Sequence, residues 1–204
     1  MCIRDRDFRV LDAMSKVERH KFVDEALWSR AYENRSLSIG HRQTISQPYI
    51  VARMTELLIQ RFVGRGLVMK NVLEIGSGCG YQSAVLAQLS ENVLGLERIK
   101  PLVRKSRINL LELRISNVKI KHADGFQAAD ELEECFDGIL CASAPRDIPT
   151  ELIPLLKKDA NLIIPVGSSN QTLTVITKKS KKNYITEQYD KVAFVPMLEG
   201  KSNH

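Results

Sequence analysis

The fold is decided by the stretch Val72-Leu73-Glu74-Ile75-Gly76-Ser77-Gly78-Cys79-Gly80-Tyr81. An apolar run ends here in three glycines at alternate positions, and a helical pattern of residues follows at once. The run predicts a buried strand that delivers the chain to a turn free of side chains. A ligand can approach the backbone closely at such a turn, which is how open α/β sheets hold nucleotide-like cofactors at the carboxyl ends of strands.

Outward from this stretch, strand and helix patterns alternate along the chain. Apolar runs predict strands at residues 71–75, 92–96, 117–121, 136–141 and 161–166. Helical patterns between them cover residues 81–89, 99–113 and 149–158, with a short one near 126–133. This alternation indicates an α/β fold with a parallel sheet covered on both faces. Residues 171–178 and 183–195 predict a closing antiparallel pair joined by a basic turn.

The first third of the chain differs from this pattern. Residues 8–33 predict helix in two pieces, and residues 34–45, rich in serine and glycine, predict a loop. A clear helix follows up to Phe62, with Ser46 able to cap it and Pro48 in its first turn. We expect residues 1–7 to be a non-native or disordered tail.

Composition narrows the class of protein further. A length of 204 residues suits one domain. The net charge of +6 comes largely from Lys157–Lys158 and residues 178–182, and no aromatic residues interleave the second cluster as a nucleic-acid platform would need. We therefore expect no nucleic-acid partner. Separately, we expect a monomeric protein.

Cysteine and histidine spacing indicates the compartment and argues against a metal. None of the four cysteines forms a CxxC pair, and the four histidines form no HExxH motif. We expect free thiols in a reducing cytoplasm and no metal. No apolar run approaches the 18 or so residues of a membrane span, so no membrane association is expected.

The glycine spacing favours one kind of cofactor. Dinucleotide sites use G-x-G-x-x-G, whereas this chain has G-x-G-x-G with Tyr81 where the third dinucleotide glycine belongs. That glycine lets the helix press close and hold a pyrophosphate at its N-terminus. A cofactor without phosphate, carrying a carboxylate, an adenosine and a positive charge, suits the loop better. S-adenosylmethionine has all three features.

Acids at three successive strands support this cofactor. Glu74 precedes the loop and can place an anion near the ammonium and sulfonium end. Glu97 lies 21 residues beyond Gly76, where an acid accepts bonds from two ribose hydroxyls. Asp124, followed by Gly125, can accept from an adenine amino group. The alternatives are a glycine turn alone, Glu97 as a helix-start acid and Asp124 as a helix cap.

Ordered motifs along the chain resemble one family. They are Gln43-Thr44-Ile45-Ser46-Gln47-Pro48-Tyr49, Val72 to Gln82, Ala144-Pro145-Arg146-Asp147-Ile148-Pro149, Ile164-Pro165-Val166-Gly167 and Phe194-Val195-Pro196. They resemble those of protein-L-isoaspartate O-methyltransferases over about residues 10–200. The Thr-Ile-Ser-Gln-Pro segment is the specific part, since many methyltransferases share the glycine loop. Arg42 departs from the pattern, because it stands where the family usually has glycine.

The resemblance implies a class I S-adenosylmethionine-dependent methyltransferase fold, Rossmann-like, in one domain of residues 8–200. Residues 8–66 would form the helical substrate side and residues 67–200 the cofactor-binding core. By position, Ser46 matches the family's active-site serine, with Thr44 beside it. The positions that match the cofactor pocket are Glu74, Gly76, Ser77, Gly78, Gly80, Glu97, Asp124 and Gly125. The implied acceptor is the isoaspartyl residue of damaged proteins.

The chemistry of this acceptor needs little from the protein. A free carboxyl titrates near pH 4 and is already a nucleophile at pH 7, so no general base is required. Ser46 and Thr44 suit the task of orienting it, although Ser46 could be a helix cap only. We expect residues 76–80 and 44–46 to share one cleft. The rival functions are methyl transfer to RNA or a small molecule, nicotinamide-dependent oxidation, which Tyr81 disfavours, and a binding module without activity.

Overall fold

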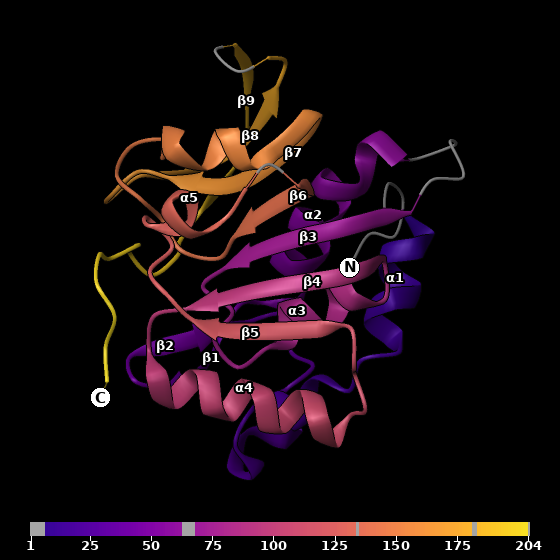
Figure 1. Ribbon diagram of the computed structural model, residues 1–204. Helices are drawn as coiled ribbons and strands as arrows, with labels where there is room; N and C mark the ends of the chain where they lie inside the picture. Colours follow the sequence, from indigo (N-terminus) through magenta and orange to yellow (C-terminus); the bar gives the residue numbers. More distant parts are fainter. Residues whose placement is uncertain (1–6, 63–67, 134, 181–182, 204) are drawn as a thin grey trace.

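The computed structural model of the chain, drawn in Figure 1, describes residues 7–62, 68–133, 135–180 and 183–203. Residues 1–6 of the predicted tail lie outside the described residues, whereas Asp7 caps the first helix by accepting a hydrogen bond from Arg9 N. Lys181 and Lys182 of the predicted basic turn also lie outside them. Within the described ranges, no helix has the length and apolar character needed to cross a bilayer.

The centre of the fold is a seven-stranded sheet in the order β5-β4-β3-β6-β7-β8-β9. The first five strands in this order run parallel, and the last two pair antiparallel. This arrangement confirms the predicted α/β class, with a mostly parallel sheet and a closing antiparallel pair. The strands are β3 (Met69–Ile75), β4 (Ser90–Glu97), β5 (Val118–His122), β6 (Phe136–Cys141), β7 (Leu156–Val166), β8 (Gln171–Lys178) and β9 (Tyr184–Val192).

Helices cover both faces of this sheet (Figure 1). Consecutive strand residues point to opposite faces, so Val72 packs in a cluster with helix α2 while Leu73 packs in one with the 3-10 helix η4. This is why the central strands carry apolar residues on both faces. The helices are α1 (Phe8–Ser15), α2 (Pro48–Ile59), α3 (Tyr81–Ala87), α4 (Lys100–Glu112) and α5 (Ala128–Glu131), with 3-10 helices η1 (Arg19–Phe22), η2 (Glu25–Arg30), η3 (Gln60–Phe62) and η4 (Thr150–Leu155).

Two helix predictions were wrong in part. Residues 8–33 hold one short α-helix and two 3-10 helices instead of two α-helical pieces. The predicted helix at 149–158 is the 3-10 helix η4, and β7 already begins at Leu156. Pro154 lies inside η4, and a proline there removes a backbone donor that an α-helix would need.

The predicted loop at 34–45 is a hairpin of β1 (Leu37–Gly40) and β2 (Gln43–Ile45). Leu37, Ile39 and Ile45 are buried, and strands this short give too little alternation to be read from sequence. Ser46 does not cap α2, because Gln47 is the N-cap residue. Pro48 takes the first helical position, where proline is favoured, and this leaves Ser46 outside the helix.

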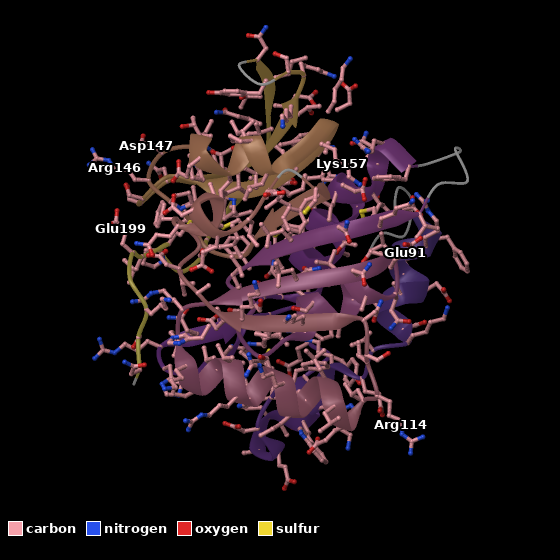
Figure 2. The ribbon with its side chains drawn as sticks, in the orientation of Figure 1. Glu91, Arg114, Arg146, Asp147, Lys157 and Glu199 are labelled. Atoms are coloured by element: carbon pink, nitrogen blue, oxygen red, sulfur yellow. The ribbon has the colours of Figure 1, made fainter. Side chains whose placement is uncertain are left out.

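The carboxyl ends of the parallel strands form one edge of the molecule, toward which the arrowheads of β3, β4 and β5 point in Figure 1. The hairpin β1–β2 and the C-terminal segment lie along this same edge. Figure 2 shows Arg146, Asp147 and Glu199 there, while Glu91 and Arg114 project from the opposite edge. The fold therefore gathers its segments of functional interest at one edge.

Candidate functional site

A cavity opens at the carboxyl ends of β3, β4 and β6, and it holds about 880 Å³ of space with its open mouth included. Its walls come from the hairpin β1–β2, the glycine corner after β3 (residues 76–80), the end of β4 and the C-terminal segment 195–198. The predicted site residues that line it are Thr44, Ser46, Glu74, Gly76, Ser77, Gly78, Glu97 and Gly125. The glycine corner and residues 44–46 thus share one cleft, as predicted.

The glycine corner needs its glycines for conformation as well as for space. Gly76, Gly78 and Gly80 have φ angles of +81°, +54° and +89°, a region that residues with a Cβ rarely adopt. A Cβ on Gly78 would also lie 3.1 Å from Cδ1 of Ile39 in the hairpin. Gly76 N donates to the carbonyl of Leu96 at 2.8 Å, which pins the corner to the end of β4. The result is a fixed stretch of bare backbone on the cavity wall.

Glu97 joins the end of β4 to this corner. Its Oε2 accepts from Gly78 N at 2.9 Å, and its Oε1 accepts from Ile99 N at 2.8 Å. Burial raises the pKa of Glu97, and the two backbone N–H groups oppose that rise. Each carboxylate oxygen has a further lone pair, so the side chain can accept hydroxyl donors from the cavity while it holds the loop.

Glu74 is fully buried near the end of β3, yet it lines the cavity. The hydroxyl of Ser83 donates to its Oε2, whereas Oε1 has no hydrogen-bond partner among the described residues. Burial raises the pKa of Glu74 to about 8; the Ser83 bond lowers it and the charge of Glu97 raises it further. An unpartnered buried acceptor costs about 1–3 kcal/mol, so a positively charged ligand group would find a ready partner here.

Asp124 and Gly80 support the site from outside the cavity. Asp124 accepts from Phe126 N at 2.9 Å and from Gly200 N at 2.6 Å, which places its carboxylate beneath the C-terminal segment. The adjacent wall is formed by Gly125 instead. The bond from Asp124 to an adenine amino group stays a prediction. Gly80 is the N-cap residue of α3.

Thr44 and Ser46 stand between two cavities. Besides the cavity at the glycine corner, both residues line a second one, of about 910 Å³ with its open mouth included, whose wall continues along residues 191–195. Thr44 is exposed and Ser46 half-buried, and neither hydroxyl donates to or accepts from another described residue. Both hydroxyls are therefore available to a ligand that reaches them from either side.

The C-terminal wall of the cavity was not among the predicted site residues. Pro196, Met197 and Leu198 line the cavity, and Met197 N donates to the carbonyl of Ala144 at 2.8 Å just beyond β6. Ala144 also forms an isolated bridge with Pro196. Both residues belong to motifs of the resemblance, but nothing in their spacing showed that the two motifs pair. The pairing depends on the antiparallel turn-back of β8 and β9.

Fold and cavity together define a class of protein. A mostly parallel sheet with a glycine corner after its third strand and an acid at the next strand end is a class I S-adenosylmethionine-dependent methyltransferase. The family model described as Protein-L-isoaspartate(D-aspartate) O-methyltransferase matches residues 3–202. The chain belongs to that family. It is therefore a protein carboxyl methyltransferase with S-adenosylmethionine as its methyl donor.

Individual relatives agree with this assignment. A protein-L-isoaspartate O-methyltransferase from Methylobacillus flagellatus is 49% identical over 198 residues, which cover 96% of this chain and 86% of the relative. One from Saccharophagus degradans is 48% identical over 192 residues, covering 94% and 84%. The crystal structure of a Plasmodium falciparum chain of the same description, in complex with S-adenosyl-L-homocysteine, aligns with a TM-score of 0.80 at 30% identity and covers 94% of this chain and 91% of that one.

Proposed function

We propose that this chain transfers a methyl group from S-adenosylmethionine to the free carboxylate of isoaspartyl residues in damaged proteins, with Ser46 and Thr44 holding that carboxylate. One observation carries the proposal: two unbonded hydroxyls and a bare glycine corner face the same cavity. Family membership supports the reaction, and the relatives from Methylobacillus flagellatus and Saccharophagus degradans carry the same description.

The residues of the cavity fit the donor. Glu74 offers an unpartnered buried oxygen where a cationic group needs an anion. Backbone at Gly76 and Gly78 leaves room for a ligand against the chain, and Glu97 can accept from two ribose hydroxyls. When bound, S-adenosylmethionine supplies a methyl group on a positively charged sulfur that leaves as a neutral thioether. We propose Ser77, Gly80, Asp124 and Gly125 as the remaining supports of this half of the site.

The acceptor carboxylate must be oriented by the protein, but it needs no general base. A carboxylate is already ionised at pH 7, so its oxygen can attack without losing a proton. Hydroxyls at Thr44 and Ser46 can donate to one oxygen and leave the other directed at the methyl group. Alignment of this kind can contribute roughly 7–11 kcal/mol to a transfer reaction. The second cavity, along residues 191–195, offers space for the peptide on either side of the acceptor.

The two halves of the cavity draw on different parts of the chain. Residues 8–66 contribute Thr44 and Ser46, and residues 67–200 contribute the glycine corner and Glu97. We propose that both belong to one domain, residues 8–200, with the acceptor side and the donor side meeting in the cavity.

The variant Ser46→Ala tests the acceptor assignment. Since the Ser46 hydroxyl has no partner among the described residues, its loss should shift Tm by less than about 3 °C. The kcat/KM for an isoaspartyl peptide should fall about 100-fold, because misaligned reactants lose part of the orientation effect. Ser15→Ala, an exposed serine at the end of α1 that lines neither cavity, is the control. Wild-type kcat/KM in Ser46→Ala would remove Ser46 from the mechanism.

Substrate class is tested separately with the wild-type chain. Labelled S-adenosylmethionine is incubated with an isoaspartyl peptide, the same peptide with ordinary aspartate, and RNA. We expect label only in the isoaspartyl peptide, released by mild base as a methyl ester should be. Label in RNA alone would support the rival function of nucleic-acid methylation.

Location, partners and assembly remain predictions. We propose a cytoplasmic monomer whose macromolecular partners are isoaspartyl proteins and not nucleic acid. The thiols of Cys79, Cys135 and Cys141 support a reducing compartment, since none of these described cysteines is in a disulfide. Light scattering during size-exclusion chromatography would measure the mass directly against the 23.1 kDa of one chain.

A further inference from the structure

Arg19 is a buried cation without a carboxylate partner. It begins η1, only 1% of it is exposed, and no ion pair joins it to a carboxylate among the described residues. Its Nη1 also has no hydrogen-bond partner there. A buried charge is normally paired, because removing an unpaired charge from water is costly. Retention of arginine at this position therefore needs a compensating role.

The remaining atoms of this guanidinium hold two distant carbonyls. Nε donates to the carbonyl of Ala31 at 2.7 Å, and Nη2 donates to the carbonyl of Ser46 at 2.7 Å. Hydrogen bonds from a charged donor at this distance are roughly twice as strong as neutral ones. The Ser46 carbonyl precedes α2, so the helix supplies no backbone donor to fix that peptide plane. Arg19 supplies it.

The same guanidinium packs on the glycine corner. Its Cζ lies 4.8 Å from the centre of the Tyr81 ring, within the range of a cation–π interaction. Tyr81 is the first residue of α3, directly after Gly80, and it lines the cavity. Phe22 stacks edge-on against the same ring at 5.4 Å between centroids. One planar group thus touches both the acceptor side and the donor side.

We propose that Arg19 is a positioning residue for methyl transfer: it fixes the peptide plane of Ser46 relative to the glycine corner, and so sets where the acceptor carboxylate sits. The proposal rests on the role of Ser46 proposed above. This role explains why an arginine occupies a site that offers no anion. Its planar guanidinium can donate several hydrogen bonds and stack on an aromatic ring at the same time. A lysine could reach one carbonyl but could neither hold both nor stack in the same way.

Kinetics of Arg19→Gln and Arg19→Lys test this role. For Arg19→Gln we expect kcat with an isoaspartyl peptide to fall about 30-fold or more per folded molecule, because a displacement near 1 Å can cost about 100-fold. Its calorimetric Kd for S-adenosylmethionine should stay within about threefold of wild type, a difference worth about 0.7 kcal/mol. Arg19→Lys should recover part of the lost kcat.

Arg107→Gln is the matched control, since the Arg107 guanidinium also donates to a backbone carbonyl, that of Ile120 at 2.6 and 3.1 Å, away from the cavity. It should leave kcat unchanged. The deciding measurement is a double-mutant cycle with Ser46→Ala, in which Arg19→Gln should lower kcat by less than about threefold once the hydroxyl is gone.

Other outcomes overturn the proposal in distinguishable ways. If kcat per folded molecule were unchanged in Arg19→Gln, Arg19 would only stabilise the fold. The same conclusion would follow if Arg19→Gln lowered kcat by the same factor in the Ser46→Ala background as in the wild type. If Ser46→Ala itself were fully active, the proposed acceptor site would fail, and the role of Arg19 would fall with it. Circular dichroism and the S-adenosylmethionine stoichiometry measure the folded fraction in every variant.

Discussion

Glu74 destabilises the ligand-free protein in a pH-dependent way. Its pKa is raised by burial to about 8, well above the ordinary value of a glutamate. Between pH 4.5 and 8 the folded chain keeps the proton of Glu74 while the unfolded chain releases it, so stability falls as pH rises. Above pH 8 the penalty is complete. A cationic ligand group beside the unpartnered Oε1 would lower this pKa and recover that free energy.

We expect Glu74→Gln to stabilise the ligand-free protein and to weaken its binding of S-adenosylmethionine. Glutamine carries no charge to desolvate, so at pH 9 without ligand the variant should melt at least about 3 °C above wild type. At pH 5, where Glu74 is protonated, the difference should nearly vanish. Its affinity for S-adenosylmethionine should fall about tenfold or more, roughly 1.4 kcal/mol. Scanning calorimetry and titration calorimetry measure the two effects.

Asp137 provides a control, because its pKa is shifted in the opposite direction to that of Glu74. Although burial opposes it, the backbone N–H of Asn71 and the Lys157 ammonium, with Lys70 N, hold the pKa of Asp137 below its usual range. This acid stabilises the fold above its unfolded pKa, and that contribution is lost as pH falls through the lower folded pKa. Asp137→Asn should therefore lower Tm at pH 9. A Tm gain in both variants would argue against the charge explanation for Glu74.

Among the elements, the hairpin β1–β2 shapes the acceptor side of the cavity. Its turn passes through Gly40, His41 and Arg42, with φ angles of +90°, +51° and +55°. Two of these residues carry a Cβ, and left-handed backbone costs roughly 1–2 kcal/mol for such residues. Ile39 of the hairpin packs against Gly78 at the glycine corner, so the hairpin and the donor side are fitted to one another.

Arg42→Gly should relieve part of this strain. Glycine adopts the observed φ freely but loses more entropy on folding, so the net gain should be about 0.5 kcal/mol. We expect a Tm rise of about 1–2 °C by scanning calorimetry. Ser38→Gly, in the extended part of β1, should lower Tm instead. A lower Tm in Arg42→Gly would mean that the arginine side chain stabilises the turn by more than its backbone costs.

At the scale of the whole molecule, the last residues of the chain close the site. Gly200 N donates to Asp124 at 2.6 Å, and Arg98 Nε donates to the carbonyl of Gly200 at 2.8 Å. Ser202 N then donates to the carbonyl of Arg98 at 2.7 Å, and Lys100 N to that of Ser202 at 2.9 Å. These bonds hold the wall at Met197 and Leu198 over the ends of β4 and β5.

A chain that ends at Leu198 should keep its fold and bind its donor poorly. Without residues 199–204 the wall at 197–198 keeps the bond from Met197 to Ala144 but loses those through Gly200 and Ser202, so the Kd for S-adenosylmethionine should rise about tenfold, which is roughly 1.4 kcal/mol. A chain that ends at Ser202 retains all four bonds and serves as the control. Equal Kd values for the two truncations, measured by calorimetry, would show that the anchor does not contribute to binding.

Local patterns were sufficient for the sheet and the glycine corner. The strands at 136–141 and 171–178 have the predicted bounds, because apolar residues recur through both segments. The hairpin at 37–45 was missed because its strands are too short to show alternation. Ser46 was expected as a cap, but Pro48 determined where the helix begins. Nothing in the sequence indicated that Arg19 is buried, because an arginine in a polar stretch has the same local pattern as an exposed arginine.

What the sequence determined differs from what the tertiary structure decided for a simple physical reason. Periodicity, glycine spacing and acids at strand ends are local properties, so the order of residues alone established an α/β methyltransferase with a cofactor corner at 76–80. The meeting of Arg19 with Ser46, of Asp124 with Gly200 and of Ala144 with Pro196 joins segments that are distant along the chain. Such contacts depend on how the elements pack, and packing belongs to the folded chain as a whole.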